Sequence, residues 1–168
     1  MQITLFETTR VSVTRAMNNL DAILDKALAS AEARKIDPSV LLGCRLAPDM
    51  FPLSRQIQIA CDFGKGPMAR LAGIENPKFE DVETTFPEMK ARIARTLEFI
   101  NSVPESSFAG AEDRDLTIQA GPQTLEFKGL PYLLGFALPN LNFHMSMAYA
   151  ILRHNGVDIG KRDYIGPA

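Results

Sequence analysis

The segment from Gly129 to Gly156, GLPYLLGFALPNLNFHMSMAYAILRHNG, is the longest strongly apolar stretch of the chain. It has Pro131 just inside its start and an Asn-Gly pair at its end, an order that is typical of the two ends of a helix. Pro139 lies inside the segment, so we expect a kink or a break just before it. A helix this long and this apolar must pack against other elements, and it therefore constrains the fold most strongly.

Three further segments repeat apolar residues at the three-to-four-residue spacing of an amphipathic helix. They cover residues 5–34, 52–72 and 85–103. Thr85 and Glu88 have the spacing of a capping box at the start of the third segment. Pro67 lies inside the second segment, which we expect to continue as one kinked helix.

Between residues 116 and 127 the period changes, because alternate residues are apolar on either side of Gly121-Pro122. This alternation predicts a short β-hairpin, which needs the helices beneath it for stability. Residues 73–84 are interpreted as a crossing loop and residues 157–168 as an extended C-terminal arm. We therefore predict an all-α protein with one domain over residues 1–168, a four-helix bundle with a small β-hairpin between helices three and four.

Composition and charge limit the classes of function. The 168 residues are 46% hydrophobic and 23% charged, an ordinary globular balance, and the net charge of −2 gives no support to a nucleic-acid surface. The sequence has no apolar run near twenty residues and no signal-peptide pattern, so we expect no membrane span and a cytoplasmic location. Cys44 and Cys61 have no CxxC spacing, and we expect both to be reduced.

Helical-wheel positions place several polar residues among apolar ones. Gln56 lies in the apolar arc of the second helix, and Asn140 and His144 lie one turn apart on the inner face of the fourth. Asp21 lies at the edge of the seam of the first helix. Buried polar groups need partners, so we expect these residues to satisfy one another. The cluster is interpreted as a structural network, as a pocket for a small ligand or metal, or as an interface.

The opposite side of the second helix carries a polar stripe. Gln58, Asp62 and Lys65 fall together there, away from the apolar arc. Such a stripe on an amphipathic helix is typical of a face in contact with water.

The segments LAPDMFPLSRQIQIACD, ETTFPEMKARIARTLEFI and PNLNFHMSMAYAILRHNGVDIGKRDY resemble an uncharacterised bacterial branch of the DinB-like superfamily of four-helix bundles. The resemblance covers nearly the whole chain, and the branch is a domain of unknown function. Better-known DinB-like proteins hold a divalent metal with three histidines, one on helix two and a His-x-x-x-His pair on helix four. This sequence departs from that pattern, with Asn140 and His144 at the pair and Gln56, Gln58 or Cys61 at the helix-two position.

One histidine and two amides are a poor donor set for Zn or Ni, because these metals prefer imidazole and thiolate. We expect no metal cofactor; if one binds, His144 would hold it together with Asn140, Gln56 or Cys61. Cys61 and His144 would also suit a nucleophile pair, although a core cysteine is the simpler interpretation. His154, at the end of its helix, is interpreted as a surface residue that stabilises the helix dipole.

Three functions follow from these observations. The first is a bundle without catalysis, present as a homodimer with a structural core network. The second, implied by the resemblance, is a metal-dependent transferase or hydrolase that uses a thiol and has a degenerate site. The third is a binder of a small apolar molecule in the bundle core, where Met145 and Met147 would line the cavity. Common catalytic motifs are absent, so the sequence leaves open whether the chain is an enzyme.

Overall fold

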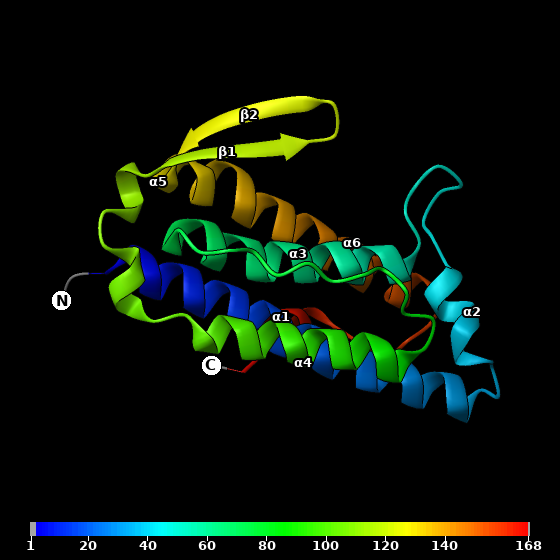
Figure 1. Ribbon diagram of the computed structural model, residues 1–168. Helices are drawn as coiled ribbons and strands as arrows, with labels where there is room; N and C mark the ends of the chain where they lie inside the picture. Colours follow the sequence, from blue (N-terminus) through cyan, green and yellow to red (C-terminus); the bar gives the residue numbers. More distant parts are fainter. Residues whose placement is uncertain (1–2, 168) are drawn as a thin grey trace.

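Four long helices form a bundle in the computed structural model, which describes residues 3–167. They are α1 (Leu5–Ala33), α3 (Leu53–Ala72), α4 (Phe86–Ser102) and α6 (Leu138–His154). Figure 1 shows α1 and α4 in one layer and α3 and α6 in the other, with the hairpin of β1 (Asp115–Ala120) and β2 (Gln123–Lys128) above them. The predicted helical bundle with a small hairpin between its last two long helices is confirmed.

Short elements lie between the long helices, and one follows the last of them. They are α2 (Pro38–Gly43), η1 (Glu105–Phe108), η2 (Ala111–Asp113), α5 (Gly129–Tyr132), the π-helical turn η3 (Leu133–Ala137) and α7 (Lys161–Ile165). The two strands of the hairpin pair antiparallel, from Asp115 opposite Lys128 to Ala120 opposite Gln123. Gly121 in the turn has a φ of 59°, a backbone conformation that favours glycine.

Local sequence signals account for the ends of the helices. The predicted capping box is present at α4, where the Glu88 N–H donates to Thr85 Oγ1 at 3.3 Å and the Thr85 N–H donates to Glu88 Oε2 at 2.9 Å. Gly73 ends α3 in the left-handed conformation, with a φ of 69°. Inside α3, Pro67 does not break the helix, which continues as one element to Ala72.

The predicted crossing loop, residues 73–84, determines the topology. Figure 1 shows that α3 and α4 run in the same direction, so the chain must return along the bundle before α4 begins. The returning segment lies against α3 and covers part of its outer face. Residues 73–84, named the crossing segment below, thus add a layer outside the four helices.

The predicted irregularity before Pro139 is present as a π-helical turn. The N–H of Leu138 donates to the carbonyl of Leu133, five residues earlier, and Pro139 has no N–H to donate. The apolar segment therefore forms α5, η3 and α6 in succession rather than one continuous α-helix.

The prediction of an extended C-terminal arm is wrong for residues 161–165, which form α7 and pack on α1. Arg15 Nε donates to the carbonyl of Ile165 at 2.7 Å, and Lys26 Nζ lies 2.6 Å from Asp163 Oδ1. The Asp163 carboxylate also accepts the N–H of Gly160 at the start of α7. The sequence prediction missed α7 because a five-residue helix has too few turns to show a period.

The core lies between the four helices, and side chains such as Met17, Met68 and Met89 are fully buried in it. Of the two methionines expected to line a cavity, Met145 is buried and belongs to this core, whereas Met147 is half-buried. Among residues 3–167, no helix combines the length and the apolarity needed to cross a membrane.

Gly129 tests the close approach of α5 to η2. A Cβ added there would lie 1.8 Å from the carbonyl oxygen of Ala111, and a backbone atom cannot move away as the end of a side chain can. We expect Gly129→Ala to lower the free energy of unfolding by at least about 2 kcal/mol in urea denaturation. Gly135→Ala is the control, because nothing lies within 4 Å of its added Cβ. It should change stability by less than about 0.5 kcal/mol, and equal losses in both variants would contradict the close contact.

Candidate functional site

A buried hydrogen bond joins α3 to α6. His144 Nδ1 lies 2.7 Å from Gln56 Oε1, and these residues are only 9% and 2% exposed. Gln56 Nε2 donates to the carbonyl of Phe51, which orients the amide oxygen toward the imidazole. Because an amide oxygen only accepts, Nδ1 carries the proton and Nε2 of the neutral ring is left as an acceptor. Of the four polar residues expected to meet, the structure brings Gln56 and His144 together.

Aromatic rings surround this pair. The Phe63 ring lies nearly parallel to the His144 imidazole at 6.1 Å between centroids, and the Phe143 ring meets it edge-on at 5.2 Å. Burial lowers the pKa of His144, and the positive charge of Arg55 lowers it further. His144 is therefore uncharged at neutral pH.

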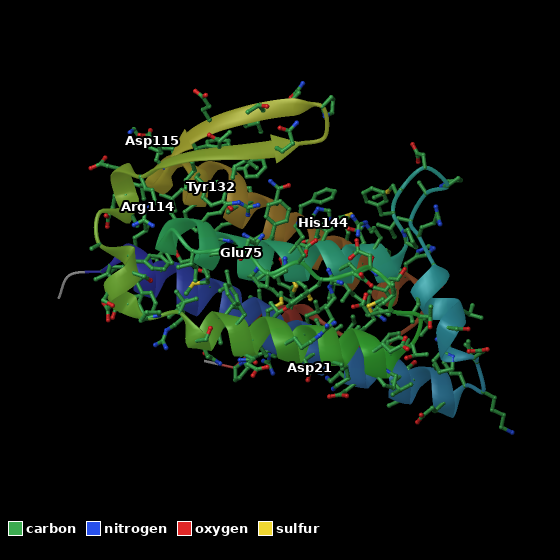
Figure 2. All side chains as sticks on the ribbon, viewed as in Figure 1. Asp21, Glu75, Arg114, Asp115, Tyr132 and His144 are labelled. Carbon is green, nitrogen blue, oxygen red and sulfur yellow. The ribbon has the colours of Figure 1, made fainter. Side chains whose placement is uncertain are left out.

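The prediction that Asn140 and Asp21 belong to the same cluster is wrong. Asn140 is half-buried and its Nδ2 donates to the carbonyl of Phe136 at 2.8 Å, beside the irregular turn before Pro139. Asp21 instead forms an ion pair with Lys90 of α4, at 3.1 Å. Figure 2 shows Asp21 on the far side of the bundle from His144. The helical wheel placed both residues facing the bundle core or at its edge. In the structure, Asn140 bonds to the Phe136 carbonyl and Asp21 pairs with Lys90 instead.

The two other residues considered for the helix-two position also have partners elsewhere. Gln58 Nε2 donates to Glu83 Oε2 in the crossing segment at 3.1 Å. Cys61 is fully buried, and burial raises the pKa of its thiol to about 12, with a hydrogen bond to Thr96 of α4 acting in the opposite direction. A thiol with this pKa stays protonated at neutral pH, which excludes an activated nucleophile paired with His144.

The donor set around His144 does not fit the three-histidine metal site of better-known DinB-like proteins. Within residues 3–167, no three His, Cys, Asp or Glu side chains gather in a way that could hold a metal ion. The amide oxygen of Gln56 is already engaged with the imidazole, and neutral amides are weak ligands for Zn and Ni.

Two polar residues on the outer face of α3 are buried. Lys65 and Gln58 are 4% and 5% exposed, because the crossing segment lies over them. The ring of Phe79, in this segment, lies 5.1 Å from Lys65 Nζ, and Lys65 forms an ion pair with Asp62 at 3.0 Å. Wheel arithmetic on one helix cannot show that another segment covers its polar face.

A fully buried arginine of α4 holds the crossing segment in place. Arg92 Nη1 lies 3.1 Å from Glu83 Oε1, and Nη2 lies 3.0 Å from Asp81 Oδ1 and 3.2 Å from Asp62 Oδ1. Arg92 also donates to the carbonyl of Glu80. One cation thus binds two carboxylates of the crossing segment and one of α3.

A groove of about 590 Å³ lies over α3. It is bounded by residues 62–70 of α3, residues 76–80 of the crossing segment, residues 118–120 of β1, and Phe136. This space is named the α3 groove below. Apolar rings and charged side chains both line it, and its volume is within the range of small-molecule sites.

The α3 groove could not be predicted from the sequence, because its walls come from three separate parts of the chain. One signal was present: Arg92 lies at helical spacing from Met89 and Thr96, all of which are buried. A charged residue on the inner face of a helix needs buried acids, which the crossing segment supplies. The position of Arg92 therefore indicated that an acidic segment lies nearby.

Comparison with solved structures defines the class of protein. The crystal structure of a DinB family member protein from Shewanella denitrificans is 44% identical in sequence and aligns with a TM-score of 0.89. The alignment covers 98% of this chain and 93% of that one. The chain is thus a DinB-like bundle, and the predicted resemblance is confirmed.

A narrower family also matches. Residues 5–165 match the family described as "Domain of unknown function (DUF1993)", and the chain belongs to this family. No curated protein matches the chain. The predicted assignment to an uncharacterised branch without an established activity is confirmed.

Replacing Arg92 tests the ionic attachment of the crossing segment. Arg92→Met keeps the volume but leaves the buried Glu83 carboxylate without its main partner. We expect a loss of about 3–5 kcal/mol in the free energy of unfolding, measured by urea denaturation. Arg95→Ala is the control, because the Arg95 side chain is 53% exposed and its contact with Glu83 is long at 3.4 Å. It should cost less than about 1 kcal/mol, and a similarly small loss in Arg92→Met would refute the attachment.

The lowered pKa of His144 predicts a pH dependence of stability. The folded protein binds fewer protons at this residue than the unfolded chain, whose histidines titrate near 6.5. Stability from this residue is complete above about pH 6.5 and declines as the pH falls below that value. We expect the urea midpoint to fall between pH 7.5 and 5.5, and to fall less in His144→Gln.

An NMR titration of the His154→Gln variant measures the pKa directly, since the chain has only two histidines. A His144 titration midpoint at or above 6.5 would overturn the prediction.

Proposed function

We propose that this protein binds a small organic molecule in the α3 groove. The observation that carries the proposal is a cavity of about 590 Å³ beside the half-buried rings of Phe63 and Phe136 and the buried ammonium group of Lys65. Apolar walls with a few oriented polar groups are typical of small-molecule sites. Burial of a lysine has a cost in desolvation, which a binding role for the groove would explain.

This proposal moves the expected ligand from the bundle core to the outside of α3. The core methionines Met17, Met68 and Met89 are packed against neighbouring side chains. The α3 groove is therefore a better-supported location for a ligand than the bundle core. His144 stacks on Phe63, one of the groove residues, and would act through that ring rather than by direct contact.

We also propose that binding needs no resident metal, that two copies of the chain associate, and that the protein acts in a bacterial cytoplasm without a nucleic-acid partner. The donor set at His144 supports the first point, and exposed apolar side chains such as Phe143 and Leu134 support the second. The unpaired thiols of Cys44 and Cys61 and the bacterial relative of known structure support the third. Cell fractionation of the native host tests the location.

Native mass spectrometry of untagged protein from its own host tests the ligand. We expect a mass excess from one bound small molecule per chain, and its loss in Ala120→Trp, because a large ring at Ala120 would fill the groove. Thr124→Trp is the control, since Thr124 is exposed on the same hairpin and does not line the groove. Retention of the ligand in Ala120→Trp would contradict the proposed location.

The same spectra report the mass of the assembly and its metal content. We expect the mass of two chains, with no zinc or nickel in either the wild type or His144→Ala. Near-stoichiometric metal that disappears in His144→Ala would instead favour the metal-dependent, thiol-using enzyme.

A further inference from the structure

Arg70 is the half-buried positive group of the α3 groove that has no acidic partner among the described residues; Lys78 also has none, but it is exposed. Lys65 pairs with Asp62, whereas no carboxylate of residues 3–167 lies within ion-pair distance of Arg70. Its Nη1 donates to the hydroxyl of Tyr132 at 3.1 Å, which leaves most of its five N–H groups for another acceptor. A half-buried guanidinium that is oriented but not neutralised is suited to hold an anion.

A glycine in α3 makes room for this guanidinium. A Cβ added at Gly66 would lie 2.4 Å from Arg70 Nη1 and 3.9 Å from Asn76 Nδ2. Glycine inside a helix lowers stability relative to alanine by roughly 0.5–1 kcal/mol, so its presence here needs a reason. The packing of the Arg70 guanidinium over Gly66 supplies that reason, because a larger residue at this position would displace the guanidinium.

Tyr132 holds the other side of the guanidinium. It is fully buried, and Figure 2 shows it between the hairpin and α3. The Arg70 guanidinium carbon lies 5.9 Å from the centre of the Tyr132 ring, within the range of a cation–π contact. Gly66 and Tyr132 together orient Arg70 before any ligand arrives, which reduces the entropy lost on binding.

We propose that Arg70, assisted by Lys65, binds the carboxylate of a small organic acid whose apolar or aromatic body lies on Phe63 and Phe136. This inference rests on the proposed ligand-binding function of the α3 groove and adds the chemical class of the ligand. The Phe63 and Phe136 rings meet edge-on at 5.9 Å and line the groove together with Ile118. A planar guanidinium matches a carboxylate with two parallel hydrogen bonds.

The charges of the groove favour a carboxylate over a phosphate. Three positive residues line it, Lys65, Arg70 and Lys78, and two acidic residues, Asp62 and Glu80. The excess is one positive charge, which balances a monoanion. A doubly charged phosphate would be left with an uncompensated negative charge near two carboxylates.

Binding of matched acids and amides tests the inference on the full-length protein. The probes are benzoate with benzamide, 2-naphthoate with 2-naphthamide, and hexanoate with hexanamide, measured by calorimetry at constant ionic strength. We expect the acid of a pair that binds to have a Kd at least about tenfold lower than its amide, as a charge-assisted hydrogen bond implies. Phenyl phosphate should bind no more tightly than benzoate.

Two variants are expected to abolish the tighter binding of acids over amides, each in a different way. Arg70→Gln removes the charge, and Gly66→Ala displaces the guanidinium while placing a better helix former in α3. In both, the acid-to-amide ratio should fall toward one, and urea denaturation should report Gly66→Ala as stable as the wild type or more so. Arg162→Gln, which removes an exposed charge on α7, should leave the ratio unchanged.

The outcomes separate this inference from the proposed function. If acids and amides bind equally, and Ala120→Trp abolishes both, the groove binds ligands but Arg70 does not select carboxylates, and the inference is overturned. Tighter binding of phenyl phosphate than of benzoate overturns the choice of carboxylate. If no probe binds the wild type, the proposed function and the inference both fail.

Discussion

The buried ion pair between Arg92 and Glu83 is the interaction on which the outer part of this structure depends. The crossing segment buries little apolar surface, because Ile74 and Val82 are exposed and Phe79 is only half-buried. Hydrophobic burial alone therefore cannot fix it to the bundle. Arg92 supplies a buried cation to which two acids and a backbone carbonyl of the segment are bound. Ion pairs with Arg92 thus attach the crossing segment to the bundle, whereas the four helices are held together by apolar packing.

The topology explains why such an attachment is needed. Because α3 and α4 run in the same direction, their connection must return along the whole bundle, and a return path without regular structure leaves many backbone groups unpaired. The crossing segment finds hydrogen-bond and ionic partners on the polar face of α3, such as Gln58. The hairpin lies on the other side of the α3 groove from this segment. Arg114, just before β1, lies directly over Gly73, where α3 ends and the crossing segment begins. The groove is therefore a consequence of the way the chain crosses.

The features that could be predicted from the sequence are those that depend on residues close together in the chain. Helix periods, the Thr85–Glu88 capping box and the alternation around Gly121 are local, and all three are present in the structure. The pairing of Gln56 with His144 was also expected, because both occupy inner positions of regular helices. Asn140 was predicted wrongly because its side chain bonds to the carbonyl of Phe136, one turn earlier in the chain, and a helical wheel does not include such a backbone partner. The burial of Lys65 depends on Phe79, which lies in a segment without a period, so no pattern could reveal it.

The attachment of α7 to α1 links segments that lie far apart in the sequence. Lys26 and Asp163 are 137 residues apart, and the bond from Arg15 Nη2 to the carbonyl of Pro167 spans 152 residues. During synthesis α1 is made early, yet these partners become available only after almost all of the described chain has left the ribosome. Arg15 and Lys26 of α1 therefore lack their C-terminal partners while α3, α4 and α6 are being synthesised. Loop closure of this length is slow compared with helix formation, so docking of α7 belongs among the last steps of folding.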